Sequence, residues 1–543
     1  MILFICFIVA MLLSLSFIPP LIKFSPSLKL IDAPNERKVH QKLIPRAGGI
    51  AIVCGALIPM LIWLPAQPSN SSLFLAIIVL LAFGIWDDRA DLDYRLKLLG
   101  QCLSAAIVIL GADIRIVTLP FLPDMQLPLI MSQILSLVVL VGVINAINLV
   151  DGLDGLAGGS TLVGFSLIAF LSMQAGDLGL TLISLSVVGA LMGFLRFNTH
   201  PAIIFMGDSG SQFLGFIAGI TSLRLTQQAD VGISPLFPLL LFAIPIFDTC
   251  AVIARRLAQG RSPFSPDRNH IHHRLLAAGL DHYETVVLIY VLQGLLALLG
   301  FYFRYHTDIE LLLILVSVLI VLFGGLNWCD RHPNRLGRLL APHMAVTPTR
   351  HQLKDGLLLL GRYCLAFLLC ALLVQSALFT AVRNSDLFIL IVGLTLLFLG
   401  AGFINRSQPT LAWPERMGIY VLCSTAIFFY YHIPVDFTAQ KSLIFLAFLG
   451  IFLFTIIGLQ FSRRHSFELS PTDYLVIFIT LTLAFYPVAD PQTRNLTISI
   501  SFLIGLFYTM EYVLNSHIFS TVQLRAGLSI SCILTLFALQ RLI

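Results

Sequence analysis

The sequence has little charge and no cysteine framework. Only 11% of its 543 residues are charged and 58% are hydrophobic, whereas a soluble domain carries roughly 25% charged residues. Its nine cysteines lie mostly inside apolar runs and include no C-x-x-C pair, which argues against a disulfide framework or a cysteine zinc site. The net charge of +5 comes from basic residues that flank apolar runs, so no nucleic-acid partner is expected. These absences exclude a single soluble core and predict an all-α polytopic membrane protein.

Apolar runs near the roughly 20 residues that cross a bilayer recur along the whole chain. The first run has no basic residue before it and no small-residue cleavage site, so we interpret it as a retained transmembrane helix. About eleven transmembrane helices are predicted before residue 330, at about 2–22, 47–65, 72–86, 98–112, 129–149, 160–174, 178–195, 210–224, 235–254, 284–303 and 309–328.

The rest of the chain predicts a second membrane region. A polar segment at about 329–355 is followed by about seven more apolar runs, at 356–380, 386–404, 417–433, 442–461, 472–487, 496–514 and 522–540. We therefore expect a membrane domain over 1–328, a cytoplasmic linker over 329–355 and a C-terminal membrane extension over 356–543. The acidic residues of the extension are scattered, and they indicate no site there.

The distribution of lysine and arginine predicts the orientation of the first eleven helices. The loops that follow the odd-numbered helices hold fifteen of these residues, and the loops on the opposite side hold three. Cytoplasmic loops carry the excess of Lys and Arg. The odd-numbered loops are therefore predicted to be cytoplasmic, with the N-terminus on the other side.

Two acidic clusters lie at these predicted cytoplasmic ends. Asp87 and Asp88 directly follow an apolar run, and two adjacent carboxylates there need a positive partner. A hard divalent cation suits them; the alternative is a helix end with solvated charges, balanced by Arg89, Arg95 and Lys97. The segment 145–159 contains Asn148, Asp151 and Asp154 among glycines, a composition that suits a phosphate–metal unit. The alternative for the second cluster is close helix packing through glycine, which explains neither its acids nor its amides.

Two further polar clusters lie on the same predicted side. Asp208 stands between glycines at the start of an apolar run, where a carboxylate also suits a simple helix cap. The loop 255–274 combines five arginines with His270, His272 and His273. Anion binding fits this loop better than zinc binding, because arginine presents forked donors to phosphate. Asp248, late in an apolar run, is interpreted either as a partner of these arginines or as a satisfied interior acid.

Taken in order, these motifs closely resemble the polyprenyl-phosphate N-acetylhexosamine-1-phosphate transferases, glycosyltransferase family 4. The motifs are Asp87-Asp88, N-x-x-D-G-x-D-G-L at 148–156, F-M-G-D-S-G-S at 205–211 and S-P-F-S-P-D-R-N-H-I-H-H at 262–273. The last is most like the branch that uses UDP-GlcNAc to start O-antigen, enterobacterial common antigen or teichoic acid linkage units. The superfamily also includes the phospho-MurNAc-pentapeptide translocase. The resemblance covers about residues 1–328.

The resemblance implies a Mg²⁺-dependent enzyme, with Mn²⁺ as the alternative ion, in the inner membrane of a bacterium with its site on the cytoplasmic face. It implies transfer of GlcNAc 1-phosphate from a UDP-sugar to undecaprenyl phosphate with release of UMP, to initiate lipopolysaccharide or cell-wall polymer synthesis; a homodimer is compatible with it. By position, Asp208 would be the principal metal ligand, together with Asp151. Asp87 or Asp88 would act on the acceptor phosphate. Asn148 would shape the metal–pyrophosphate site, and Asp154 would face the uracil. The diphosphate contacts would come from the basic loop: His270, His272, His273, Arg256, Arg261 and Arg268.

Two departures from the peptidoglycan branch argue against a MurNAc-pentapeptide donor. Arg89 follows the acidic pair, with Lys97 further on, and Ile271 interrupts the histidines. FucNAc or QuiNAc donors stay open. The alternative class is a secondary transporter, but transporters bury their acids in broken helices near the midplane, whereas these acids cluster at loop edges on one side.

Overall fold

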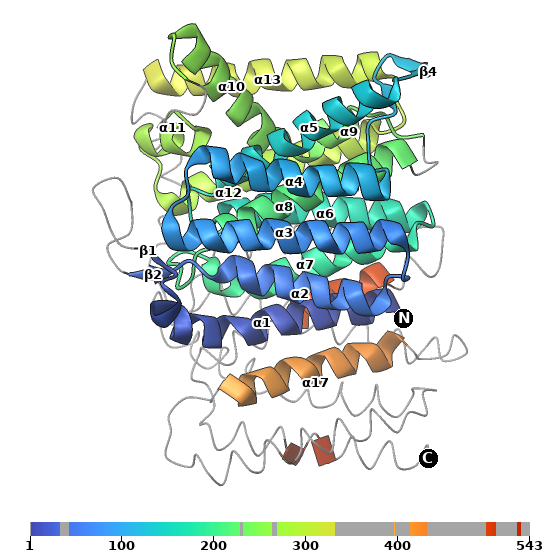
Figure 1. Ribbon diagram of the computed structural model, residues 1–543. Helices are drawn as coiled ribbons and strands as arrows, with labels where there is room; N and C mark the ends of the chain where they lie inside the picture. Colours follow the sequence, from blue (N-terminus) through green and yellow to red (C-terminus); the bar gives the residue numbers. More distant parts are fainter. Residues whose placement is uncertain are drawn as a thin grey trace, which may run out of the picture. The chain divides into compact units, whose positions relative to one another are not determined.

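The computed structural model describes residues 2–32, 43–228, 232–262, 269–331, 396, 413–431, 496–506, 529–530 and 532–533. The first part of the chain is a bundle of long helices with two short antiparallel hairpins (Figure 1). Its helices are α1 (Ile2–Leu28), α2 (Gly48–Trp63), α3 (Pro68–Ala90), α4 (Tyr94–Ala112), α5 (Leu129–Val150), α6 (Leu156–Gln174), α7 (Leu178–Asn198), α8 (Gly207–Leu223), α9 (Phe237–Leu241), α10 (Ala243–Ala258), α11 (Ile271–Ala277), α12 (His282–Phe303) and α13 (Asp308–Arg331). A π-helical turn, η1 (Arg224–Gln228), extends α8.

The two hairpins mark the two ends of this bundle. The strands β1 (Ile31–Asp32) and β2 (Ile44–Pro45) pair beside the end of α1 and the start of α2, and β3 (Thr118–Leu119) pairs with β4 (Leu122–Gln126) at the opposite end (Figure 1). We call these the β1–β2 end and the β3–β4 end. The described parts of the loops after α3 and α7 meet the β1–β2 hairpin: Arg46 lies 3.5 Å from Asp91, and the N–H of Phe205 donates to the carbonyl of Pro45.

The predicted spans before residue 330 are confirmed as helices, with one difference. Eight described helices are long and apolar enough to cross a membrane, α2 is a shorter apolar helix of 16 residues, and α8 has 17 residues. The run predicted at 235–254 is divided at Phe242 into α9 and α10. Pro245 has no N–H to continue the helical ladder to the carbonyl of Leu241, which explains the interruption.

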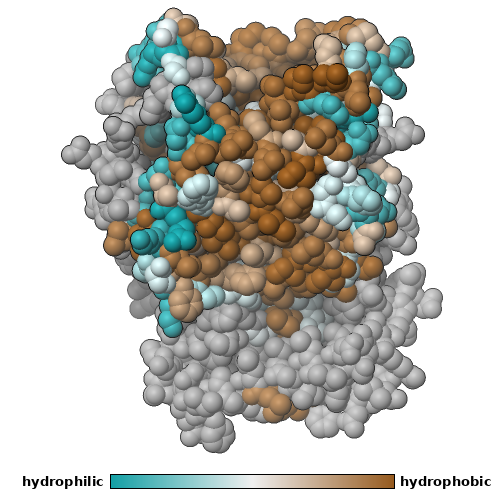
Figure 2. All heavy atoms as spheres, in the orientation of Figure 1, coloured by the Kyte–Doolittle hydropathy of each residue, from teal (hydrophilic) through white to brown (hydrophobic). Residues whose placement is uncertain are grey.

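The core of the bundle is built around α6, α7 and α8. In an 18-residue apolar stretch of each helix, 89% of the residues of α6 and 83% of those of α7 are buried. Every residue of α8 from Ser209 to Leu223 is buried. The helices α3, α4 and α5 lie further out, and only 33% of the residues in the corresponding stretch of each are buried. Their outward faces form a hydrophobic surface with hydrophilic residues toward the two ends (Figure 2). This distribution is that of a multi-pass membrane protein with its polar chemistry at the helix ends.

The contacts divide the chain into two units, Met1–Ala345 with Ser470–Leu475, and Val346–Leu469 with Val476–Ile543. In the second unit, α17 (Trp413–Tyr431) coincides with the run predicted at 417–433, and residues 496–506 are helical within the run predicted at 496–514. The runs predicted at 356–380, 386–404, 442–461 and 472–487 lie outside the described residues, apart from residue 396. So do the run predicted at 522–540, except at four positions, and nearly all of the linker 329–355.

Candidate active site

The acidic pair at the end of α3 is buried at the β1–β2 end. Asp87 and Asp88 are 1% and 7% exposed. The Asp87 carboxylate forms an ion pair with Lys97 of α4 at 2.6 Å and accepts a hydrogen bond from the N–H of Leu92 at 2.8 Å. Because a buried charge is stable only when it is paired, Lys97 is part of this site.

Asp88 holds the start of α8. Its carboxylate accepts hydrogen bonds from the N–H groups of Asp208 (2.7 Å) and Ser209 (3.1 Å). A helix N-terminus presents unsatisfied N–H groups and a partial positive charge, so a carboxylate is a favourable partner. Gly207 permits this approach: its φ is +72°, and a Cβ there would lie 2.5 Å from the carboxylate of Asp88. The cap of α8 therefore comes from α3, and the side chain of Asp208 is not used as the cap.

The side chain of Asp208 joins three helices. Its carboxylate accepts a hydrogen bond from the amide of Asn148 on α5 at 2.5 Å and lies 3.2 Å from the Nζ of Lys97 on α4. The same Asn148 amide donates to the Oγ of Ser211 at 2.8 Å. Lys97 thus lies between Asp87 and Asp208, two carboxylates that are far apart in the sequence.

Asp151 directly follows the last residue of α5 and lies near other carboxylates. Desolvation, together with the nearby charges of Asp208 and Asp88, raises the pKa of Asp151 to about 7. The structure therefore gathers Asp87, Asp88, Asn148, Asp151 and Asp208 in one region. We call these five residues the carboxylate cluster. Their oxygen-rich side chains match the ligands that Mg²⁺ prefers, and their excess negative charge gives the region a use for a cation.

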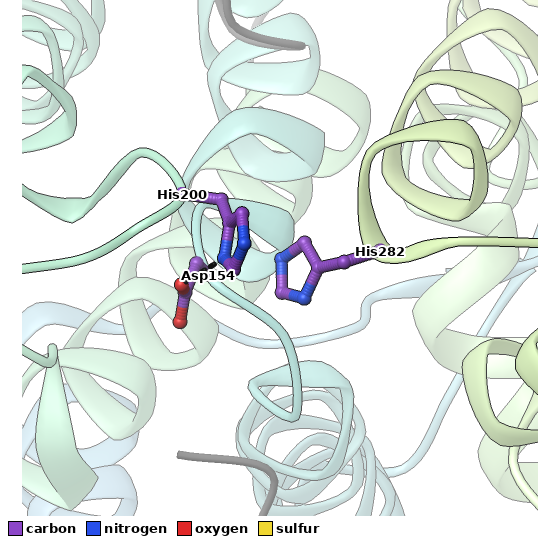
Figure 3. A group of neighbouring side chains, drawn as sticks. All are labelled: Asp154, His200 and His282. Atoms are coloured by element: carbon purple, nitrogen blue, oxygen red, sulfur yellow. Dashed lines mark hydrogen bonds and ion pairs between the residues drawn. The ribbon is translucent and has the colours of Figure 1, made fainter. Parts of the chain in front are cut away.

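Asp154 lies in a second group of side chains, with His200 and His282 (Figure 3). Its Oδ2 is 2.7 Å from the Nδ1 of His200 and accepts a hydrogen bond from the N–H of Ala202 at 3.1 Å. The rings of His200 and His282 stack with centroids 4.0 Å apart. Burial opposes the shift, but the bond from His200 lowers the pKa of Asp154, and the same bond raises the pKa of His200.

Asp248 was considered above as a partner of the arginines. The partner that the structure shows for it is His270. The Nδ1 of His270 lies 2.8 Å from Oδ2 of Asp248, whose other oxygen accepts a hydrogen bond from the N–H of Ile271 at 2.9 Å. Both side chains are buried. The carboxylate therefore favours the tautomer with the proton on Nδ1, which directs the Nε2 lone pair away from Asp248.

His272 links α11 to the Asp-Gly segment. A Cβ on Gly152 would lie 2.4 Å from the Nε2 of His272, so only glycine allows this contact. Desolvation, with the neighbouring histidines adding to it, lowers the pKa of His272 to about 3, so this ring is neutral. The ring of His273 packs against it, with centroids 4.3 Å apart.

The structure describes two of the three arginines predicted to bind the diphosphate. Arg256 is buried in the last turn of α10, and Arg261 is exposed just beyond that helix. Arg268 lies outside the described residues. The roles predicted for these arginines, like those of the histidines and acids, stay predictions.

The structure adds two residues, His200 and His282, for which the sequence predicts no role, and it gives specific partners to two others, Lys97 and Asp248. Lys97 and Asp248 had a sequence signal, because each is a charged residue near an apolar run. His200 lies in the quoted segment before Asp208, but no spacing rule pairs it with Asp154. His282 begins α12 and has no motif around it, so only the packing of the helices shows its neighbours.

The first part of the chain matches a known family. The model of glycosyl transferase family 4 matches residues 70–226. These include nearly all of α3, the helices α4 to α8 and the whole carboxylate cluster. The loop with His270, His272 and His273 lies beyond the matched residues.

Curated relatives match a longer stretch of the chain. A probable undecaprenyl-phosphate N-acetylglucosaminyl 1-phosphate transferase of Bacillus subtilis is 35% identical over 320 residues, 58% of this chain and 89% of the relative. An undecaprenyl-phosphate alpha-N-acetylglucosaminyl 1-phosphate transferase of Yersinia pestis is 34% identical over 338 residues, 61% of this chain and 92% of the relative. That of Escherichia coli O157:H7 is 31% identical over 329 residues, 59% and 88% respectively.

Proposed function

The chain belongs to glycosyltransferase family 4, and from this premise we propose that it transfers N-acetylglucosamine 1-phosphate from UDP-GlcNAc to undecaprenyl phosphate, releasing UMP. The observation that carries the proposal is the meeting of Asp87, Asp208 and Asn148 around Lys97 at the end of a membrane bundle. A lipid phosphate is confined to this level of the membrane, so a site at the helix ends can reach it.

In the proposed reaction an oxygen of the lipid phosphate attacks the β-phosphorus of the UDP-sugar. A new phosphoanhydride forms between the lipid phosphate and the sugar phosphate, the α–β anhydride breaks, and UMP leaves with the bonding electron pair. Both reactants are anions, so positioning and charge neutralisation dominate such a reaction. One anhydride replaces another, and we expect the reaction to be readily reversible.

Mg²⁺ fits the donor set of the carboxylate cluster, with Asp208 and Asp151 as the residues that would hold it. When bound, the ion would neutralise charge on the diphosphate. Lys97 holds Asp87 and Asp208 on either side of its ammonium group. Asp88 fixes the first turn of α8 and so the position of Asp208. We assign Asp88 a positioning role on this ground, and Asp87 the place nearest the acceptor phosphate.

We assign the positive charge opposite the acids to the arginines of the loop 255–274, and a hydrogen bond to His270, which can donate from Nε2 only once that nitrogen is protonated. Asp248 orients His270, and the contact of His272 with Gly152 brings α11 beside the segment that holds Asp151. Donors placed where charge develops stabilise the departing UMP. The excess of lysine and arginine at the β1–β2 end supports a cytoplasmic location for this end, in the inner membrane of a bacterium. The resulting lipid-linked amino sugar would start a cell-surface polysaccharide.

The direct test is release of UMP by the purified full-length protein supplied with UDP-GlcNAc, undecaprenyl phosphate and Mg²⁺. We expect one UMP for each lipid product and none when the acceptor is omitted. The same assay with UDP-GalNAc, UDP-QuiNAc and UDP-FucNAc identifies the preferred sugar. Uptake of intact UDP-GlcNAc into vesicles without UMP formation would favour a transporter and would refute the proposal.

A further inference from the structure

Asp154, His200 and His282 come from three separate elements that are tied together by buried hydrogen bonds. Asp154 is in the loop after α5, His200 is in the loop after α7, and His282 is the first residue of α12 (Figure 3). The N–H of Gly155 donates to Asn198 at 3.0 Å, which links the first two loops. The hydroxyl of Tyr290 on α12 donates to the carbonyl of Gly155 at 2.6 Å.

The position of His282 is fixed by the cap of its helix. Asp281 caps α12, and Glu284 completes a capping box with hydrogen bonds of 2.7 and 3.0 Å. The backbone that carries the ring is therefore preorganised beside Asp154. The group is built by bonds outside itself, which distinguishes it from a chance meeting of surface side chains.

The two ring nitrogens of His282 are buried with few hydrogen-bonding partners. Both of its ring nitrogens are buried, and within the described part of the chain the main chain of Asp154 can satisfy only one of them. A buried polar group without a partner is unfavourable, and its retention calls for a ligand or a functional reason. The nearest ring is that of His200, against which it stacks at an interplanar angle of 22°.

We propose that Asp154, His200 and His282 form a binding site for a transition-metal ion of the Zn²⁺ class, separate from the carboxylate cluster. One carboxylate oxygen and one nitrogen from each ring lie within 4.8 Å of one another. Two imidazoles and a carboxylate suit Zn²⁺ and its neighbours, whereas Mg²⁺ prefers oxygen alone. Water would complete the fourth position.

The geometry requires a small rearrangement when an ion enters. Metal–nitrogen bonds of about 2.0–2.1 Å place tetrahedral ligand atoms roughly 3.3 Å apart. A turn of the His282 ring about its Cβ–Cγ bond would bring a lone pair toward the Asp154 carboxylate, in exchange for the contact with the main chain of Asp154. On the other side, the ion replaces the proton shared between Asp154 and the Nδ1 of His200.

Under the proposed function, this ion would regulate the enzyme, because the resemblance assigns Asp154 to the donor's uracil. A bound ion would occupy this carboxylate and compete with the UDP-sugar. Binding is nevertheless measured without substrates, so failure of this inference is distinguishable from failure of the proposed function.

The test is Zn²⁺ binding to the purified full-length protein, measured by competition with a chromophoric chelator in the presence of excess Mg²⁺. We expect one site per chain, and we expect His282→Ala to weaken it by more than about tenfold, since even outer-shell partners of a metal have effects of that size. His282→Asn serves as a milder variant, and elution as a monodisperse peak checks that both variants fold.

Matched variants identify the ligands. His273→Gln, in the neighbouring histidine group, and Asp208→Asn, in the carboxylate cluster, should both retain the site. X-ray absorption of the Zn²⁺-loaded protein should show two imidazole nitrogens with oxygen ligands. Equal affinity in wild type and His282→Ala, loss in His273→Gln instead, or displacement by Mg²⁺ would each overturn the assignment.

Discussion

The two ends of the bundle treat their acidic residues differently. At the β3–β4 end, carboxylates have separate partners: Asp113 pairs with Arg115 at 2.6 Å, Asp177 with Arg224 at 3.3 Å and Glu310 with His306 at 3.2 Å. At the β1–β2 end, Asp87 and Asp208 share one lysine, and Asp151 has carboxylates as its neighbours. A carboxylate with its own partner needs no ligand, whereas the carboxylate cluster holds more acidic groups than basic ones and so suits the binding of a cation.

The largest effect on the rate should come from neutralising a carboxylate of the carboxylate cluster. Asp208→Asn keeps the side-chain shape but removes the charge, and we expect kcat for UMP release to fall by at least about 10²–10³-fold, as for other groups that stabilise developing charge. Asp177→Asn at the opposite end is the matched control. It should change kcat by no more than a few fold, and similar losses in both variants would erase the distinction between the two ends.

Lys97 should have the next largest effect, because it competes with any cation for Asp87 and Asp208. In Lys97→Met we expect kcat to fall by about 10–100-fold, the range for groups that orient metal ligands. The Mg²⁺ concentration for half-maximal rate should fall as well, since the positive competitor is gone. Lys97→Arg should restore part of the rate. A Mg²⁺ titration identical to that of wild type would contradict this role.

Asp248 provides a smaller and more selective test of the basic side of the site. Asp248→Asn retains an acceptor for the N–H of Ile271 but can donate to Nδ1 of His270 and so reverses its tautomer. We expect kcat to fall about tenfold, with little change in the donor KM and an altered pH–rate profile. Asp330→Asn, which removes the partner of Arg274 on the same helix α11, should leave the pH profile unchanged. A shift shared by both variants would indicate a purely structural effect.

The smallest effect concerns the packing beneath the cluster and is measured as stability. A Cβ on Gly84 of α3 would lie 2.5 Å from the Cα of Ser209, whereas a Cβ on Gly142 of α5 would meet nothing within 4 Å. Gly84→Ala should therefore destabilise the protein by about 1–3 kcal/mol through overpacking, seen as a lower Tm in detergent. Gly142→Ala should be neutral or slightly stabilising, since glycine inside a helix costs about 0.5–1 kcal/mol relative to alanine. A Tm for Gly84→Ala at or above that of wild type would show that the contact can relax.

Much of the fold could be predicted from the sequence, because each membrane span must carry its own apolar length. The acidic motifs were also visible, since a charge at the edge of such a span is costly and conspicuous. What the chain does with each charge depends on which helix faces meet. Asp88 as the cap of α8 and Lys97 between two acids follow from the packing of α3 and α4 against α8. The interruption at Phe242 was missed because hydropathy does not register a lost N–H at Pro245.

The contact between Gly84 and Ser209 has a consequence for how substrates come and go. Main chain lies against main chain there, and Asp88 fastens the same turn of α8 to α3. This wall has no room to swing outward without separating two helices. We therefore expect this side of the site to keep its shape when a ligand enters or leaves.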